Sequence, residues 1–426
     1  MSDLPPTQAA LPNDHGSSSP IRAQFAPKAL EILAAAQRVV VRDGAEKLSL
    51  RAVAREAGET SSLVLYYFSS MENLEALLLD SLWHEIVLDF IADMDSMPSD
   101  VGRRIDALIE FHSRIAHEPG LYKVYVDLVA HVIPSETIRT NVARIYEGYR
   151  HDINRPLLAA PWLSEEQVDA RAALVLAAGE GIPIHALMMP EPRQDLVFDL
   201  LSHLLKRNMQ VADAVPGSLR EAPPVDRARQ RPDFDSLPTA PAAQRLVIAG
   251  QELIRTGGLR SLSLESTARV SGEARPSVGY YFGNKKGFIE AIALTALRDW
   301  VECIESQVDD REDLTGPNLE IRFFHPASPL ATVVLIMPVV MRSDRLREVA
   351  EHCNAYVLQR LANAFGHTSR DGTSTVHPAV ARLFTATLIG LTLQHLYDPE
   401  HFSPTSALDV LCEITLNASL QPSPAG

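Results

Sequence analysis

The chain has 426 residues, 46% of them hydrophobic and 22% charged, which allows two or three globular domains. Its net charge of −15 excludes a nonspecific coat for nucleic acid, whereas specific DNA binding depends on where the basic residues lie. No uninterrupted run reaches the roughly eighteen apolar residues of a membrane span, so we expect no membrane segment.

The N-terminal segment, residues 1–24, is rich in proline, serine and aspartate, with neither a basic start nor an apolar block. This composition predicts a disordered leader and argues against a secretory signal. Cys303, Cys353 and Cys412 lie far apart, and none belongs to a CxxC motif. We therefore expect reduced thiols in a cytoplasmic protein.

Residues 25–75 predict three short helices and the start of a fourth, joined by tight turns. Ser49 is a typical cap for the second helix, and Gly58 permits the turn that follows it. The third helix is expected at Ser61–Phe68, and a long fourth helix at Glu72–Met94. On the first helix, the residues expected to face the core are Leu30, Leu33, Val40 and Val41.

Residues 76–210 predict a helical domain punctuated by prolines, in which Ala172–Leu187 is apolar nearly all round, as in a helix buried on several sides. Residues 211–240 are rich in proline and lack an apolar period, which predicts a linker. As a coil, such a linker spans about 30 Å and lets the second half of the chain pack beside the first.

Residues 241–289 repeat the pattern of residues 25–75. Gln37–Leu74 aligns without a gap with Gln251–Phe288, and thirteen of the 38 positions are identical. Unrelated segments would share about two or three, so the chain contains a duplicated module. Residues 290–420 predict a second helical domain.

Two short helices joined by a glycine-bearing turn and supported by a preceding helix are typical of a helix-turn-helix. Such a motif either binds DNA or has a purely structural role. Leu48–Leu74 and Leu262–Phe288 both resemble the DNA-binding domain of the TetR family of bacterial repressors. The likeness lies in the Ala-Arg-x-x-Gly turn, the Tyr-Tyr-Phe end of the third helix and the polar segment after it. We call residues 25–75 and 241–289 the first and second readers.

The resemblance implies an all-α fold of two lobes, each a reader followed by a helical domain for ligand binding and dimerisation. Gly181–Leu187 (GIPIHAL) and Gly390–Leu396 (GLTLQHL) resemble the family's penultimate helix. Since family members are homodimers, we expect this chain to be a fused pseudo-dimer, with a further pairing of two chains left open. The helices expected to pack together are Ala170–Met189 and Asp195–Gln210 against Pro378–Tyr397 and Pro404–Asn417.

Candidate DNA contacts lie at the start of the second helix and at both ends of the third helix of each reader, and in the second reader also at the start of the fourth helix. Short hydroxyls there reach base edges or phosphates, and Arg275 is suited to a guanine edge. One tyrosine of each Tyr-Tyr pair is as well explained by core packing as by DNA contact. The candidates are Ser49, Thr60, Ser61, Ser62, Tyr66 and Tyr67, and in the second reader Ser263, Ala274, Arg275, Ser277, Tyr280, Tyr281, Lys285 and Lys286.

The two readers differ in charge. Met71 occupies a position where family members usually have a lysine, which the second reader keeps as Lys285. Glu59 and Glu273 lie beside the turns, where a carboxylate near phosphates weakens binding unless it accepts from a cytosine. We therefore expect weak DNA binding by the first reader, partly compensated by Arg22, Lys28 and Arg38.

The resemblance also implies a pocket for a small, mainly apolar effector inside each helical domain. For every candidate, plain core packing is the alternative. The candidates are Phe111, Tyr122, Tyr125, His131, Glu180 and His185 in the first domain, and Phe323, Phe324, His352, Tyr356, Gln394 and His395 in the second.

Motifs of catalysis are missing: there is no glycine-rich phosphate loop, no GxSxG and no HExxH. The histidines lack partners at metal-ligand spacing. We expect no catalytic residue, no metal and no cofactor. The sequence thus predicts a ligand-responsive repressor of double-stranded operator DNA. Two alternatives remain, a protein that sequesters a partner after its first reader has decayed, and a small-molecule enzyme on a helical scaffold.

Overall fold

The computed structural model describes residues 26–82, 84–94, 96–118, 120–132, 135–188, 194–211, 217–220, 230–308, 315–325, 328–365 and 378–416. The expected leader at residues 1–24, with Arg22, lies outside the described residues. Every regular element within these ranges is a helix, in agreement with the all-α prediction.

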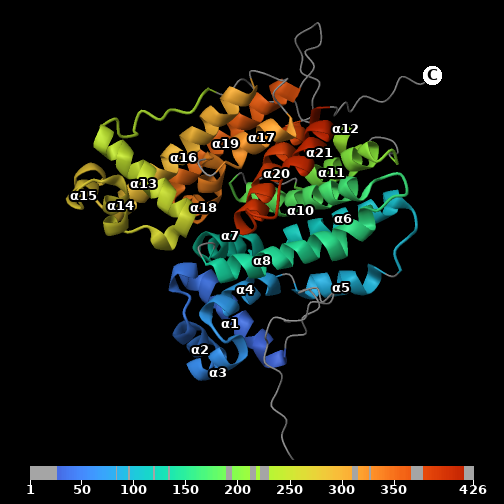
Figure 1. The fold of residues 1–426 in the computed structure, drawn as a ribbon, viewed down its shortest axis with the longest axis horizontal. Helices are drawn as coiled ribbons and strands as arrows, with labels where there is room; N and C mark the ends of the chain where they lie inside the picture. Colours follow the sequence, from blue (N-terminus) through green and yellow to red (C-terminus); the bar gives the residue numbers. More distant parts are fainter. Residues whose placement is uncertain are drawn as a thin grey trace, which may run out of the picture.

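The first half builds one reader and a bundle of longer helices behind it (Figure 1). In chain order the elements are α1 (Pro27–Asp43), η2 (Ala45–Lys47), α2 (Leu50–Ala57), α3 (Ser61–Phe68), α4 (Met71–Ser81), α5 (His84–Met94), α6 (Val101–Ala116), α7 (Leu121–Val132), α8 (Glu136–Gly148), η3 (Tyr149–Asn154), α9 (Arg155–Leu158), α10 (Glu165–Met188) and α11 (Gln194–Asn208).

The second half follows the same order after a short helix in the linker. Its elements are α12 (Gly217–Arg220), α13 (Pro241–Gly257), η4 (Leu259–Ser261), α14 (Leu264–Ser271), α15 (Pro276–Phe282), α16 (Lys285–Val308), α17 (Gly316–Phe323), α18 (Pro329–Met341), α19 (Asp344–Phe365), α20 (Pro378–Tyr397) and α21 (Thr405–Leu416). The readers, α1–α3 and α13–α15, project from the body at the bottom and at the left of the view (Figure 1).

Helix α1 buries a different face from the one predicted. Leu33 and Val40 are buried, but Val41 is 67% exposed and Leu30 is 37% exposed. Small alanines take part in the contact with the other reader helices, which shifts the buried stripe around the helix. The remaining buried residues of α1 are Ala29, Ile32, Ala35, Ala36 and Val39.

The expected long helix Glu72–Met94 is wrong. Helix α4 ends at Ser81, whose hydroxyl donates to the carbonyl of Leu78 at 2.9 Å, and α5 begins at His84. In the second half, α16 is continuous over Lys285–Val308. The helix that follows the first reader is therefore shorter than the helix that follows the second reader.

Helices α10 and α20 cross at the centre of the molecule, where α11 and α21 also pack against them (Figure 1). A β-carbon on Gly181 would lie 1.7 Å from the carbonyl oxygen of Ala386, and one on Gly390 would lie 2.0 Å from that of Ala177. The glycines and alanines lie one helical turn apart in each helix, so the two contacts are reciprocal. Only glycine permits this approach of the two backbones.

Helix α10 and residues Ala379–Tyr397 of α20 are long and apolar enough to cross a membrane by length and composition alone. Most of each helix is buried within the protein. The expectation of no membrane segment rests on uninterrupted apolar runs, and these two helices interrupt such runs with polar residues such as Glu180 and Gln394.

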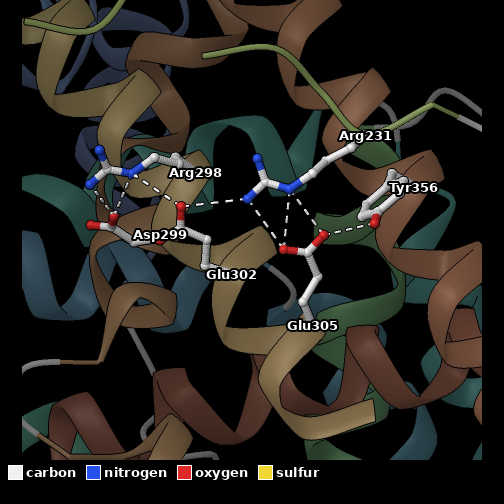
Figure 2. A network of polar contacts seen from close by, with 6 residues as sticks. All are labelled: Arg231, Arg298, Asp299, Glu302, Glu305 and Tyr356. Carbon is white, nitrogen blue, oxygen red and sulfur yellow. Dashed lines mark hydrogen bonds and ion pairs between the residues drawn. The ribbon is translucent and has the colours of Figure 1, made fainter. Parts of the chain in front are cut away.

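The described end of the linker is attached to the second helical domain (Figure 2). The Nε atom of Arg231 donates to Glu305 of α16 at 3.1 Å, and its Nη2 atom lies 3.5 Å from Glu302. Glu305 also accepts a bond of 2.7 Å from the hydroxyl of Tyr356 on α19. This end of residues 211–240 is therefore held in place rather than being a free coil.

Ser69, which follows α3, has a φ of 61°, and Gly283 occupies the equivalent position after α15 with a φ of 74°. A side chain at positive φ adds about 1–2 kcal/mol of strain to the folded state. Glycine avoids this strain, but part of the gain is offset because its backbone has more freedom in the unfolded chain. Replacing Ser69 by glycine should raise the free energy of unfolding by about 0.5–1 kcal/mol in urea denaturation. The reverse change, Gly283→Ala, should lower it, and a loss of stability in Ser69→Gly would contradict this account.

Candidate functional site

The first reader has the predicted helix-turn-helix geometry. The hydroxyl of Ser49 accepts from the backbone N–H of Ala52 at 3.3 Å and caps α2. Gly58 adopts the left-handed conformation that the turn requires, with a φ of 69°. Thr60 lies just before α3 as its cap and accepts from the N–H of Leu63 at 3.2 Å. The caps satisfy helix-end donors and fix the angle between the two helices.

The second reader repeats this geometry with different side chains. The Ser263 hydroxyl accepts from the N–H of Ser266 at 3.0 Å, and Ser266 returns the bond to the N–H of Ser263. Gly272 again adopts the left-handed conformation. Helix α15 begins at Pro276, and Arg275 precedes it without a capping bond from its side chain. The exposed guanidinium of Arg275 is thus available to a partner outside the protein.

Most of the predicted DNA contacts lie on exposed surface. The residues classed as exposed are Ser49, Thr60, Ser62, Ser263, Ala274, Arg275, Tyr280, Tyr281, Lys285 and Lys286, while Ser61, Ser277, Tyr66 and Tyr67 are half-buried.

The two tyrosine pairs differ. Tyr67 packs against the core, and its ring meets that of Tyr66 edge to face at 5.3 Å. In the second reader Tyr280 is 84% exposed, and Tyr281 is 36% exposed. The second reader therefore presents more apolar and basic surface to a partner than the first.

Each glutamate beside a reader turn has a basic partner within its own reader. Glu59 lies 2.7 Å from the Nζ atom of Lys28, and Glu273 lies 2.6 Å from the Nη2 atom of Arg245. The sequence alone suggests only a DNA phosphate or a cytosine as the neighbour of these carboxylates. The alignment of the readers does not reveal these ion pairs, because Lys28 on α1 and Arg245 on α13 do not occupy equivalent positions.

Ion pairs also occupy the basic residues that were expected to compensate the first reader. Lys28 contacts both Glu31 and Glu59, while Arg38 lies 2.9 Å from Glu56. The hydrogen bond from Arg42, followed by that from Arg38, lowers the pKa of Glu56 below its usual range. Within the described chain, by contrast, Arg275 and Lys285 form no ion pair that would compete with phosphate. These contacts favour the predicted difference between the readers.

A buried carboxylate of the first helical domain anchors the first reader. Asp127 on α7 accepts from the buried N–H of Ala45 at 2.9 Å and from Nη2 of Arg342 at 2.7 Å. The neighbouring His131, one of the effector candidates, bonds instead to the carbonyl of Asp127 at 2.8 Å. A cavity of about 300 Å³ borders this contact between α1, α7 and the end of α18. The first reader, the first domain and the second half of the chain thus meet at Asp127.

The second reader is bonded to α4, the helix that joins the first reader to the first helical domain. Arg260 in η4 lies 2.5 Å from Glu75 on α4, whose side chain is only 1% exposed. Burial raises the pKa of Glu75, and the bond to Arg260 opposes that shift. In both readers a donor therefore pairs with a buried carboxylate, the backbone N–H of Ala45 with Asp127 in the first and the guanidinium of Arg260 with Glu75 in the second.

Three effector candidates of the first domain lie together. Glu180 on α10 accepts a bond of 3.4 Å from the hydroxyl of Tyr125, and the Tyr125 ring lies edge to face with that of Tyr122 at 5.9 Å. The other three candidates have other contacts or none that joins them to these residues: Phe111 stacks on Phe90 at 4.1 Å, His131 bonds to the carbonyl of Asp127, and His185 is buried on α10. The tyrosine and glutamate cluster is the part of the prediction that the fold assembles.

The cluster also contains polar residues that are not among the candidates chosen from the sequence. Tyr146 on α8 bonds to the hydroxyl of Tyr125, and Tyr397 from the second half lies 5.5 Å from the ring of Tyr146. Asp80 on α4 and Tyr149 in η3 are also buried in this domain, and burial, followed by the charges of Asp80 and Glu180, raises the pKa of Tyr149 well above its usual value. An aspartate inside the apolar run of α4 was the only sequence signal for them.

The candidates of the second domain do not form one pocket. Phe323 packs against Trp300, and Phe324 lies edge to face with His395 at 5.8 Å. His352 is exposed and bonds to the carbonyl of Gln230 at 2.9 Å, so its assignment to an interior face is wrong.

Two further candidates hold parts of the chain together. Gln394 donates to the carbonyl of Ala173 at 3.1 Å and accepts from Arg150 at 2.9 Å, which joins α20 to the first half. Tyr356 holds Glu305 at the end of the linker (Figure 2). Among the residues with described placement, no group of three or more His, Cys, Asp or Glu side chains is arranged to hold a metal ion.

Residues 32–76, which contain most of the first reader, match the family model for bacterial regulatory proteins of the tetR family. None of the curated proteins matches the chain. The matched segment covers α2 and α3 with their caps, the turn at Gly58 and the start of α4. The chain therefore carries, at residues 32–76, the tetR-family domain of a DNA-binding transcriptional regulator.

Proposed function

We propose that the chain is a cytoplasmic, ligand-responsive repressor in which two unequal readers act as a fused pseudo-dimer on an asymmetric operator. The observation that carries the proposal is the reciprocal contact of Gly181 with Ala386 and of Gly390 with Ala177. Such a contact is what a two-fold axis between two equivalent subunits produces. Together with a matched DNA-binding domain and its repeat, it supports one chain in the role of a dimer.

The operator follows from the different recognition helices. A homodimer places identical helices in successive major grooves, roughly 34 Å apart, and therefore selects a palindrome. Here α3 follows Thr60 and opens with Ser61-Ser62-Leu63, whereas α15 follows Arg275 and opens with Pro276-Ser277. Different side chains in equivalent places select different bases.

We test the function by footprinting on DNA that flanks the protein's own gene, followed by single-base substitution across the protected site. The expected result is a site with unequal halves, one of which carries a guanine opposite Arg275. Equal penalties in the two halves of a perfect palindrome would contradict the fused pseudo-dimer, because two chains would then present the same reader. Absence of any protected site would contradict DNA binding itself.

Arg275→Ala should weaken operator binding by about 1–3 kcal/mol, because it removes an exposed base-contacting guanidinium. Ser61→Ala in the first reader should weaken it less, since Ser61 is half-buried and offers only a hydroxyl. Fluorescence anisotropy at one fixed salt concentration measures both changes. A larger loss for Ser61→Ala would show that the first reader dominates.

A second candidate is a protein that sequesters a partner through its helical surface. The ion pairs of Lys28, Arg38 and Arg42 favour it, because they leave the first reader few basic groups for phosphate. The same footprinting experiment separates the candidates, since a sequestering protein leaves the DNA unprotected.

A further inference from the structure

Two carboxyl groups lie in the interior of the first helical domain without a cationic partner in contact. Glu180 is 5% exposed and Asp80 is 3% exposed. The Oε2 atom of Glu180 and the Oδ2 atom of Asp80 have no hydrogen-bond partner among the described residues. A buried carboxylate oxygen that accepts nothing is costly, unless the group is neutral or a ligand supplies the missing partner.

Tyrosine rings from several helices surround Glu180. Tyr122 and Tyr125 come from α7, Tyr146 from α8, Tyr149 from η3 and Tyr397 from α20, and all are buried. The hydroxyl of Tyr397 also has no partner in the described part of the chain. A cation is attracted both by a carboxylate and by the faces of tyrosine rings.

A surface groove borders this cluster at Tyr397. It has a volume of about 530 Å³, runs between α8 and the end of α20, and includes Tyr397 in its lining. The ring of Tyr397 lies 5.5 Å from that of Tyr146, whose hydroxyl bonds to Tyr125, and Tyr125 in turn bonds to Glu180, so aromatic side chains connect the wall of the groove to Glu180.

The second helical domain has no carboxyl group at the two positions equivalent to Glu180 and Asp80. In the alignment that pairs Gly181 with Gly390, Glu180 corresponds to Ile389, and in the alignment of the readers continued along α4 and α16, Asp80 corresponds to Leu294. Both aliphatic residues are buried. Burial of a carboxyl group is therefore not a requirement of this fold, since an aliphatic side chain fills the same place in the other half.

We propose that the first helical domain, and not the second, binds an organic monocation with apolar substituents, whose charged head pairs with Glu180 inside the tyrosine cluster. The role of the cation as effector of the repressor rests on the proposed function, whereas its binding to the protein does not. It supplies the contact that Glu180 lacks, and its apolar substituents fit the aromatic walls. Asp80 on α4 adds negative charge from the helix that directly follows the first reader.

The protonation of Glu180 gives the binding a characteristic pH dependence. Burial, opposed by bonds from Tyr146 and Tyr125 and by the charge of Arg150, raises the pKa of Glu180 to about 8. The cation pairs with the ionised form, so below pH 8 binding must release a proton and weakens by about tenfold per pH unit. Asp80, whose pKa burial raises to about 7, is the other acid that titrates in this range.

The remaining groups around Glu180 keep one charge state between pH 6 and 8. Burial raises the pKa of the surrounding tyrosines well above their usual value, so they stay neutral. His112 on α6, next to Gly179, has a pKa that burial lowers to about 4, and it is neutral as well. Arg150 is charged throughout. A rise in affinity from pH 6 to 8 is therefore a signature of the two buried acids.

The test uses benzyltrimethylammonium and its uncharged carbon analogue neopentylbenzene, titrated into the full chain by calorimetry. We expect the cation to bind at least tenfold more tightly than the analogue at pH 8, and to lose affinity towards pH 6. Glu180→Gln should reduce cation binding at least thirtyfold and remove most of the pH dependence. This variant keeps the shape and neutrality of the protonated side chain, so it should fold, which circular dichroism checks.

Glu147→Gln is the matched control, because Glu147 is exposed, lines the same groove and carries the same charge. It should change cation affinity less than twofold. Equal binding of the two probes, or equal losses in Glu147→Gln and Glu180→Gln, would overturn the inference. Release of operator DNA by the cation is measured separately, so that a chain that binds the cation but no DNA contradicts only the proposed function.

Discussion

Replacing Gly181 by alanine should lower the free energy of unfolding by about 3 kcal/mol or more, as measured by urea denaturation followed by circular dichroism. The new β-carbon would lie 1.7 Å from the carbonyl oxygen of Ala386, so the two backbones must separate. Separation also strips contact from the neighbouring apolar side chains of α10 and α20. Gly390→Ala should have an effect of similar size, because its β-carbon would meet the carbonyl of Ala177 at 2.0 Å.

Gly279 in α15 provides the control for these changes. It is a helical glycine with no atom within 4 Å of an added β-carbon. Gly279→Ala should therefore stabilise the protein by about 0.5–1 kcal/mol through helix propensity alone. If Gly181→Ala costs less than about 1 kcal/mol, the helices do not cross as closely in solution, and the pseudo-dimer loses its main support.

Asp127→Ala should lower the free energy of unfolding by about 2–4 kcal/mol and loosen the first reader in particular. The change removes the acceptor of a charge-assisted bond from Arg342 and leaves the buried N–H of Ala45 without its partner. Hydrogen exchange of the amides in α1–α3 measures the local effect, and urea denaturation measures the global one. The exchange rates should rise more in the first reader than in the second.

Asp43→Ala serves as the comparison, because Asp43 borders the same cavity but is exposed and pairs with its neighbour Arg42 at 2.9 Å. Its loss should leave the urea midpoint and the exchange of α1–α3 unchanged, since exposed ion pairs contribute little. If the two variants behave alike, Asp127 does not anchor the reader.

The local structure of the readers follows from short stretches of the sequence. Helix α3 spans Ser61–Phe68 as predicted, and Ser49, Gly58 and Gly272 occupy the cap and turn positions that their chemistry favours. These features depend on residues within a few positions of one another, so a single chain segment contains all the information. The repeat likewise appears in the sequence because both copies kept the residues that the turn and the small core require.

Contacts between distant segments, in contrast, depend on how the helices pack in three dimensions. The pairs Lys28–Glu59 and Arg260–Glu75 join residues whose sequence positions give no hint of contact, and an ion pair requires only proximity, not a spacing. The exposed face of α1 was missed for a related reason, because alanines can line a core as well as larger apolar residues do. Apolar periodicity alone does not determine how a helix is turned.

The interior of the first helical domain combines both kinds of information. Glu180 and Tyr125 were candidates because a carboxyl group and an aromatic hydroxyl are unusual on otherwise apolar helices. Tyr397 could not be assigned to them, since it comes from the opposite half and reaches Tyr146 only through the close crossing of α10 and α20. The residue types came from the sequence, but backbone packing at Gly181 and Gly390 decided which of them share one interior.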